Sequence, residues 1–413
     1  MSDAAIARER KIILLLAAVS FVNILDFVMV IPLGPEFARG LGTPTSRLGL
    51  LGTSYTGAAA LAGLVGTLFL DRFDRRSALT VAMLGLVTAT AAGGLARSFD
   101  MLLGARVVAG VFGGPATSIG LAILTDVIAP ERRGKALGQV MGAFSVASVV
   151  GVPMSIVLAS WAGWRVPFFV VAGMGLLLVV GALFLMPPMR GHLERPRVAV
   201  ERRSLATFAG DPTVVLALTG MACLHLGSFV LILNLAAWVQ GNLGFAPGDM
   251  WQPYLVGGFV SFAAMQVGGR LVDRKGSLPI ILSGSVLFVV VVAISFLPER
   301  SWLPVMGVFV GFMLANSFRM VAMNTLSTRV PLPSERARFM SAQSAAQHTA
   351  AAAAGAISTR VLTNAPGGAL LGMNRLGMLS IVLTAVVPAF VWVVTVRLRR
   401  RETAAELVQA PAR

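Results

Sequence analysis

Apolar stretches of about 20 residues, each long enough to cross a lipid bilayer as a helix, recur along the whole chain. Since lipid offers the backbone no hydrogen-bond partners, these stretches are expected to form helices rather than strands. The sequence therefore predicts an all-α integral membrane protein with twelve transmembrane helices. The expected spans lie near 11–33, 47–70, 77–96, 100–125, 136–160, 166–187, 213–238, 250–271, 278–297, 303–327, 338–361 and 377–397.

The composition agrees with a membrane protein. Of 413 residues, 56% are hydrophobic and 13% are charged, whereas a soluble domain is about 25% charged. The net charge of +16 raises nucleic-acid binding as an alternative. However, the basic residues lie in short clusters between apolar runs, as in membrane proteins. A single cysteine, Cys223, excludes an internal disulfide, and three histidines without metal-type spacing argue against a zinc site. We expect no metal and no cofactor.

The connecting segments predict the topology. If the N-terminus is cytoplasmic, most of the 34 Lys and Arg fall in cytoplasmic segments, as the positive-inside rule requires. Both termini are then cytoplasmic. The polar segment 189–212 becomes a basic cytoplasmic linker between one six-helix bundle at 1–188 and a second at 213–413, which ends in a short cytoplasmic tail. A cleaved signal peptide is the alternative for the N-terminus, but the apolar run is longer than such a peptide needs.

A charged cluster occurs twice, at equivalent places in the two expected bundles. An Asp-Arg pair stands at 71–72 and again at 273–274, 202 positions later. Arg133 in "PERRGKAL" and Arg336 in "PSERARFM" are 203 apart. Two charged clusters that recur at nearly the same offset favour duplicated, pseudo-symmetric halves, which are a known transporter architecture. Two unrelated basic loops, the alternative, would explain the arginines but not the matched aspartates.

With these motifs the chain resembles the major facilitator superfamily over essentially its whole length. The segment "GRLVDRKG" at 269–276 is similar to the family's loop motif G-x-L-x-D-R-x-G-R-R/K. The first copy differs, with Thr67 and Asp74 where the family usually has glycine. Arg106, followed by glycines at 110, 113 and 114, is similar to the family's R-x-x-x-G motif in helix 4.

The fifth span, at 142–168, resembles the helix 5 motif of the family's antiporters, with Gly142, Gly151 and Pro153 in place. Met154 and Ser155 replace its later glycines. Among subfamilies the chain is most similar to the twelve-helix drug:proton antiporters and their sugar-efflux-like branch, which implies a bacterial inner membrane. We expect Gly138 and Gly142 to let helices approach closely, and Pro153 to permit a bend.

Asp26 is the one acidic residue expected inside a span away from its ends. A charge at that depth costs about 2.5–3.5 kcal/mol even on the lenient insertion scale, so such residues are usually functional. We predict that Asp26 carries a proton and that Arg106, expected at the same depth, is its partner. The alternatives are a structural aspartate and an arginine that only packs helices. Arg319 is expected to snorkel toward the inner surface.

Polar and aromatic side chains inside the spans are the candidates for a substrate cavity, although each alone is more readily a packing contact. The candidates are Asn23, Phe27, Tyr55, His225, Phe229, Asn234, Gln343, Gln347 and His348.

A second set at the cytoplasmic ends is expected to gate the transporter, and the resemblance implies that Arg75 pairs with Asp126. The gating residues are Asp71, Arg72, Arg75, Asp126, Arg133, Asp273 and Arg274. The alternative role for the arginines is topology anchoring alone.

The sequence predicts a proton-coupled antiporter that exports small amphipathic molecules or drugs by alternating access. The alternative is a sugar or lipid facilitator or symporter with different or no ion coupling. The sequence lacks a nucleotide loop, a metal-ligand pair on one helix and a Ser/His/Asp arrangement, which argues against an enzyme. The expected partners are a small-molecule substrate, protons and membrane lipid, without nucleic acid, and the expected state is a monomer.

Overall fold

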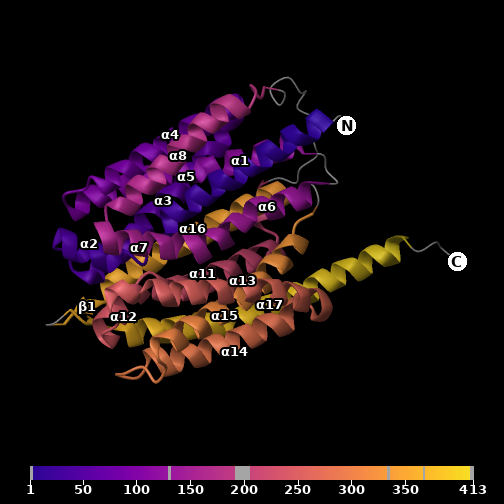
Figure 1. Ribbon diagram of the computed structural model, residues 1–413. Helices are drawn as coiled ribbons and strands as arrows, with labels where there is room; N and C mark the ends of the chain where they lie inside the picture. The colour runs from indigo at the N-terminus through magenta and orange to yellow at the C-terminus, as the bar shows by residue number, and fades with distance from the viewer. Residues whose placement is uncertain (1–2, 129–131, 191–204, 333–334, 366–367, 410–413) are drawn as a thin grey trace. The chain divides into compact units, whose positions relative to one another are not determined.

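The chain is almost entirely helical (Figure 1). A computed structural model describes residues 3–128, 132–190, 205–332, 335–365 and 368–409. The helices up to residue 185 are α1 (Asp3–Val28), α2 (Gly34–Leu41), η1 (Thr45–Arg47), α3 (Gly49–Phe69), η2 (Leu70–Arg72), α4 (Arg75–Gly94), α5 (Phe99–Val127), α6 (Arg133–Val146), η4 (Ala147–Gly151), α7 (Val152–Ala162) and α8 (Val166–Leu185).

The later part of the chain continues the helical pattern and adds one short hairpin. Its elements are α10 (Leu205–Ala209), α11 (Pro212–Ile232), α12 (Leu235–Leu243), η5 (Pro247–Asp249), α13 (Trp251–Lys275), α14 (Ser277–Phe296), α15 (Val305–Arg329), α16 (Arg336–Val361), β1 (Thr363–Asn364), β2 (Leu370–Leu371) and α17 (Met373–Gln409). The two strands pair antiparallel, and the side chain of Asn242 bonds the backbone of Leu370 at both its N–H and its C=O.

Within the described residues, 11 helices are long and apolar enough to cross a membrane. Eleven of the twelve expected spans are among them. The twelfth, α16, is a helix of 26 residues, but its sequence "AQSAAQHTAAAAAG" is too polar to qualify by hydropathy. The all-α membrane fold expected from the sequence is therefore confirmed.

The internal repeat extends to the ends of the secondary-structure elements. Gly42 and Gly244 end α2 and α12 in the same left-handed conformation, with φ of 64° and 65°. A short 3-10 helix follows each, η1 and η5, and α3 and α13 follow these. The helices α4 and α14 repeat in the same way. An offset of 202 residues relates the ends of α2 and α12, the two 3-10 helices, the starts of α3 and α13, and both ends of α4 and α14. The offset of the charged clusters therefore holds for the fold as well.

Cα packing divides the chain into two compact units. The first comprises 1–197, 232–258 and 351–372, and the second comprises 198–231, 259–350 and 373–413. In the first unit α5 packs against α3 and α4, α4 packs against α8, and α1 packs against α6. In the second unit α14 packs against α15 and α17. The bundle boundary expected at 189–212 stays a prediction, and residues 191–204 lie outside the described residues.

Local sequence signals fix where the helices of the first unit begin. Asp74 precedes α4 and accepts a hydrogen bond from the backbone N–H of Ser77, and Ser98 precedes α5 and accepts one from Met101. Such caps satisfy backbone donors that a helix leaves open at its first turn. These starts set the register of α4 and α5, on which Thr90 and Arg106 lie.

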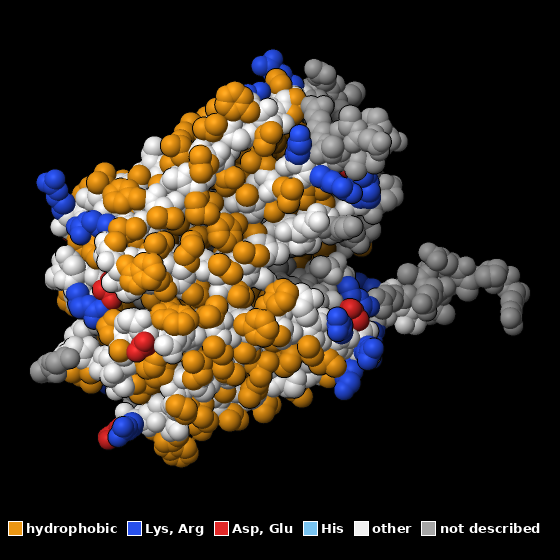
Figure 2. All heavy atoms as spheres, viewed as in Figure 1, with side chains coloured by type: hydrophobic (Ala, Val, Ile, Leu, Met, Phe, Trp, Pro, Cys, Tyr) orange, Lys and Arg blue, Asp and Glu red, His pale blue; other side chains and the backbone are white. Residues whose placement is uncertain are grey.

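The outward face has the composition expected of a lipid-exposed surface. Hydrophobic side chains dominate the face shown in Figure 2, while Lys and Arg gather toward its edges. Many large apolar side chains are exposed, such as Phe184 at 84%, Trp161 at 81% and Leu177 at 72%. A soluble protein rarely exposes so much contiguous apolar surface.

The first span differs from the expectation that it would run to about residue 33. Helix α1 ends at Val28, and after a turn the chain starts α2 at Gly34. Pro32 and Pro35 supply no backbone N–H, so a regular helix cannot continue through them. Asp26 consequently lies in the last turn of α1 rather than deep within a long helix.

Candidate functional site

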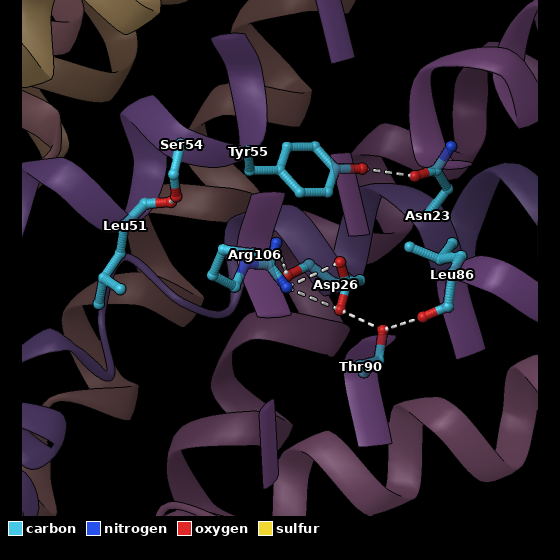
Figure 3. A network of polar contacts seen from close by, with 8 residues as sticks. All are labelled: Asn23, Asp26, Leu51, Ser54, Tyr55, Leu86, Thr90 and Arg106. Carbon is cyan, nitrogen blue, oxygen red and sulfur yellow. Dashed lines mark hydrogen bonds and ion pairs between the residues drawn. The ribbon is translucent and has the colours of Figure 1, made fainter. Parts of the chain in front are cut away.

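Asp26 and Arg106 form a buried ion pair inside the first unit (Figure 3). Their side chains are 0% and 1% exposed. Nη1 of Arg106 lies 3.0 Å from Oδ1 and 2.9 Å from Oδ2 of Asp26, and Nη2 donates to the main-chain oxygen of Asp26 at 3.1 Å. The structure thus brings together the two residues that the sequence nominated for proton coupling. Charge-assisted bonds of this kind are among the strongest in proteins.

Thr90 on α4 adds a hydroxyl to the ion pair. Its Oγ1 lies 2.8 Å from Oδ1 of Asp26 and 2.8 Å from the carbonyl oxygen of Leu86 (Figure 3). A hydroxyl has one proton, so it can donate to only one of these two oxygens at a time. Thr90 is not among the residues predicted from the sequence, because a threonine that bonds back to its own helix is common in apolar helices and gives no distinctive signal.

A second group of contacts orients the arginine from α3. The Tyr55 ring lies under the guanidinium, with Cζ of Arg106 4.7 Å from the ring centroid. The Tyr55 hydroxyl donates to Oδ1 of Asn23 at 2.7 Å, and Phe27 stacks on Tyr55 at 5.2 Å. Three of the predicted cavity residues, Asn23, Phe27 and Tyr55, therefore surround the ion pair. A cation over an aromatic face is stabilised by the ring quadrupole.

The glycines that follow Arg106 let α5 approach α3. A Cβ on Gly110 would clash with the backbone oxygen of Tyr55, and one on Gly114 would lie 2.6 Å from the backbone oxygen of Ala59. Without side chains at these positions the two helices approach closely, as small residues allow in membrane helices. Nδ2 of Asn23 bonds the carbonyl of Gly113 at 2.8 Å, which ties α1 to the same stretch.

The fifth span is interrupted beside the ion pair. Residues 147–151 form a π-helical turn, η4, between α6 and α7, and Pro153 follows. A Cβ on Gly151 would lie 2.8 Å from Cδ1 of Leu25, the neighbour of Asp26. Single π-helical turns are frequent at functional sites. The motif at Gly142, Gly151 and Pro153 thus contacts α1 through Gly151.

Gly138 and Gly142 make no close helix contact within the described residues of the first unit. A Cβ on either residue would meet no atom within 4 Å. Gly138 is exposed and Gly142 is half-buried. Within this unit Gly151 makes the close approach, and the contact expected at Gly138 and Gly142 stays a prediction.

Where α4 begins and α5 ends, the structure brings Arg75 and Asp126 together. Nε of Arg75 lies 3.4 Å from Oδ2 of Asp126. Beside them, Asp74 bonds the backbone N–H of Ser77 at 3.0 Å and of Met189 at 2.6 Å. Partial burial raises the pKa of Asp74, but these backbone hydrogen bonds and nearby Arg190 outweigh it and hold the pKa below its ordinary value.

The gating role of the other predicted residues stays a prediction. Arg72 is exposed, and Asp273 and Arg274 are exposed at the end of α13. The side chains of Asp71 and Arg133 lie outside the described residues.

Polar side chains predicted for the cavity also occur beyond the ion pair. In the second unit His225 and Gln347 both contact Met221, at its carbonyl oxygen and at its sulfur. His225 on α11 stacks on Phe229 at 6.0 Å. On α16, Gln343 bonds Asn324 at 3.3 Å and Gln347 bonds the sulfur of Met221 at 3.5 Å. The other two are Asn234, buried at the start of α12, and His348, half-buried on α16.

Arg319 contradicts the snorkelling expected of it. It is 0% exposed, and its guanidinium lies 4.1 Å from the ring centroid of Phe288 within the second unit. The charge therefore stays inside the helical packing rather than reaching an aqueous surface. The sequence position of Arg319 could have indicated this burial. It lies ten residues before the end of α15, and an arginine side chain is too short to reach water from that depth.

The family model of the Major Facilitator Superfamily matches residues 16–356. A chloramphenicol resistance protein of Streptomyces lividans is 31% identical over 293 residues, covering 70% of this chain and 73% of the relative. A probable 4-methylmuconolactone transporter of Cupriavidus pinatubonensis is 27% identical over 305 residues, covering 71% and 70%.

Solved structures have the same fold. A bacterial homologue of the human lysosomal transporter Spinster, inward-facing and unoccupied, matches with a TM-score of 0.72 at 16% identity, covering 97% of this chain and 99% of that one. The human organic anion transporter MFSD10 matches with a TM-score of 0.65 at 18% identity, covering 93% and 99%. At these identities the likeness concerns the fold alone.

Proposed function

The chain belongs to the Major Facilitator Superfamily, and from that premise we propose that it is a proton-coupled antiporter that exports small amphipathic molecules. Membership makes it a multi-pass membrane transporter rather than an enzyme. The proton coupling, the direction of transport and the residue roles are our proposal. The observation that carries it is the ion pair of Asp26 and Arg106, buried inside an apolar helical unit.

The buried pair couples protonation to movement of charge. While Asp26 is ionised, its carboxylate neutralises the guanidinium of Arg106 at 2.9 Å. Protonation of Asp26 removes that counter-charge and leaves Arg106 as a buried, uncompensated cation, which is strongly destabilising. The protein relieves this cost by moving Arg106 toward water or substrate. Protonation thereby favours a different arrangement of α1 and α5.

Thr90 gives both protonation states a complete hydrogen bond. When Asp26 is ionised, the Thr90 hydroxyl donates to its Oδ1. When Asp26 is protonated, the carboxyl proton is donated to Thr90 Oγ1 and the threonine proton turns to the carbonyl oxygen of Leu86. A rotation of one hydroxyl accommodates both states, so proton loading requires no rebuilding of α4.

The interrupted fifth span supplies a flexible element next to the proton site. The π-helical turn η4 and Pro153 both weaken the regular hydrogen bonding of that span. Because Gly151 packs directly on Leu25, movement of α1 at Asp26 is transmitted to this turn. We propose that bending here accompanies the change between inward- and outward-facing states.

The proposed direction is export from the cytoplasm across an inner membrane. Entry of one proton down 100 mV supplies about 2.3 kcal/mol, enough for a concentration ratio of roughly fiftyfold. The resistance protein of Streptomyces lividans motivates an amphipathic drug as the substrate class. In the first unit, the aromatic rings of Phe27 and Tyr55 beside the ion pair suit such a molecule.

The test is proton movement on substrate addition. Inverted membrane vesicles containing the protein are energised with a pH gradient, chloramphenicol and other amphipathic compounds are added, and an acridine dye reports the gradient. We expect collapse in wild type and in the matched control Asp100→Asn, whose aspartate is exposed at the start of α5. We expect no collapse in Asp26→Asn.

The other outcomes separate the alternatives. Undiminished collapse in Asp26→Asn would contradict the role of Asp26. Absence of collapse with a compound shown to bind wild type would favour a facilitator or a different coupling ion.

A further inference from the structure

Arg319 in the second unit is a buried cation whose contacts are all neutral. Its Nη1 lies 3.4 Å from Oγ of Ser228, and its Nη2 lies 3.1 Å from Oγ1 of Thr384. Its Nε, also buried, has no hydrogen-bond partner, and no carboxylate among the described residues pairs with it. Buried charges in proteins are normally paired with an opposite charge, so this arrangement requires an explanation.

The hydroxyl of Ser228 cannot act as a substitute for a carboxylate. It lies 2.8 Å from Oδ1 of Asn316 and 3.0 Å from the carbonyl oxygen of Leu224, so its proton is directed to one of these acceptors. What it offers Arg319 is a single neutral lone pair. The guanidinium therefore keeps its full positive charge and most of its five N–H donors available to an anion.

The internal repeat supplies a comparison at the residue that meets the arginine, although the arginines themselves are not equivalent, because Val308 stands at the position of Arg106. The offset of 202 that relates α4 to α14 places Ser228 at the position of Asp26. The neighbours correspond too, with Phe229 at the position of Phe27. In the first unit the residue at this position gives a buried arginine its counter-charge, whereas in the second unit it gives a hydroxyl.

The surroundings of Arg319 are shaped to hold its side chain in place. Gly284 on α14 leaves room for the stem, since a Cβ there would lie 3.1 Å from Cγ of Arg319. Phe288, on the same helix, lies against the guanidinium. These contacts fix the fork of the guanidinium in one orientation, which suits a planar, bidentate acceptor such as a carboxylate.

We propose that Arg319, with Ser228 and Thr384, is the binding site for a small monovalent anion that supplies the missing counter-charge. The anion is either a carboxylate group of the transported molecule or chloride from solution. Because Arg319 has no exposed surface here, the anion reaches it when the surrounding helices separate during the transport cycle. In naming a carboxylate as part of the substrate, the inference rests on the proposed transport function.

The experiment measures anion binding, which does not depend on proton coupling. The purified full-length protein in nanodiscs is titrated with sodium benzoate, with neutral benzamide and with sodium chloride, and thermal unfolding is followed at constant ionic strength set by a bulky sulfonate buffer. We expect a saturable rise in the melting temperature with an anion and none with benzamide. Ser228→Asp, which supplies an internal carboxylate, should weaken the apparent affinity at least about tenfold. Ser228→Asn, which changes the same side chain without adding a charge, should weaken the affinity less than Ser228→Asp.

The arms separate the two sources of the anion. A response to benzoate but not chloride identifies a substrate carboxylate, whereas a response to chloride alone identifies the inorganic ion. The proposal is overturned if neither anion stabilises wild type, or if the response persists unchanged in Arg319→Gln. If Ser228→Asp does not fold, Arg319→Gln serves as the test variant in its place. Asp26→Asn should keep the anion response while losing proton movement, so failure of the proposed coupling is distinguished from failure of this site.

Discussion

Arg106 bonds both carboxylate oxygens of Asp26 and, with its second terminal nitrogen, the main-chain oxygen of the same residue. The arginine therefore bonds both the backbone of the last turn of α1 and the carboxylate of Asp26. Loss of the charge on Asp26 weakens both contacts together, because the guanidinium that holds the backbone is the one that the carboxylate neutralises. Because of this double contact, we expect the protonation state of Asp26 to control the conformation at the end of α1.

Arg106→Lys should reduce proton-coupled transport at least about tenfold, because an ammonium cannot hold both carboxylate oxygens and the backbone oxygen in one plane. The measurement is drug-dependent collapse of a pH gradient in inverted vesicles. The exposed Arg97→Lys is the matched control and should behave as wild type. Full activity of Arg106→Lys would show that only the positive charge matters.

Thr90→Val should lower the rate of drug-dependent proton movement several-fold, since the variant keeps the shape of the side chain but removes the hydroxyl that bonds Asp26. Thr90→Ser retains the hydroxyl and should restore most of the rate. The comparison is made at equal protein levels in the same vesicle assay. Equal rates for the valine and serine variants would limit Thr90 to packing.

Gly114→Val should destabilise the first unit by about 1–3 kcal/mol, because the added Cβ would lie 2.6 Å from the backbone oxygen of Ala59 and force α5 away from α3. Gly138→Ala is the control, since a Cβ there meets nothing within 4 Å. Thermal unfolding in detergent measures both variants. A melting temperature of Gly114→Val equal to that of wild type would contradict the close packing of the two helices.

The pair of Asp211 and Arg401 should make stability depend on pH in the acid range. Partial burial raises the pKa of Asp211, but hydrogen bonds from the Thr213 backbone and from Arg401 at 2.8 Å outweigh it, so the pKa is lowered from 3.8. A lowered folded-state pKa contributes stability that is present above the unfolded value and is lost as the pH falls through the folded value.

Asp211→Asn should therefore lower the melting temperature at pH 7, and the difference from wild type should shrink below pH of about 4. Thermal unfolding of the two proteins at both pH values measures this. A difference that stays constant between the two pH values would mean that the ionised carboxylate contributes nothing to stability.

The sequence by itself determined the class of fold. Long apolar runs require a bilayer and a helical backbone, and the 202-residue offset of the Asp-Arg pairs already contained the repeat that the helix boundaries follow. It also singled out Asp26, because a carboxylate inside an apolar run is costly enough to be conspicuous. None of these conclusions requires knowing which helices pack against one another.

Only the tertiary structure decided which side chains meet. The contact of Asp26 with Arg106 spans 80 residues and that with Thr90 spans 64. It also decided that Arg319 lies inside the packing of the second unit and that Gly151 makes a close contact with α1. The physical reason is the solvent. In lipid the inward and outward faces of a helix are both apolar, so hydrophobic periodicity does not reveal which face is buried, and packing against the other helices settles it.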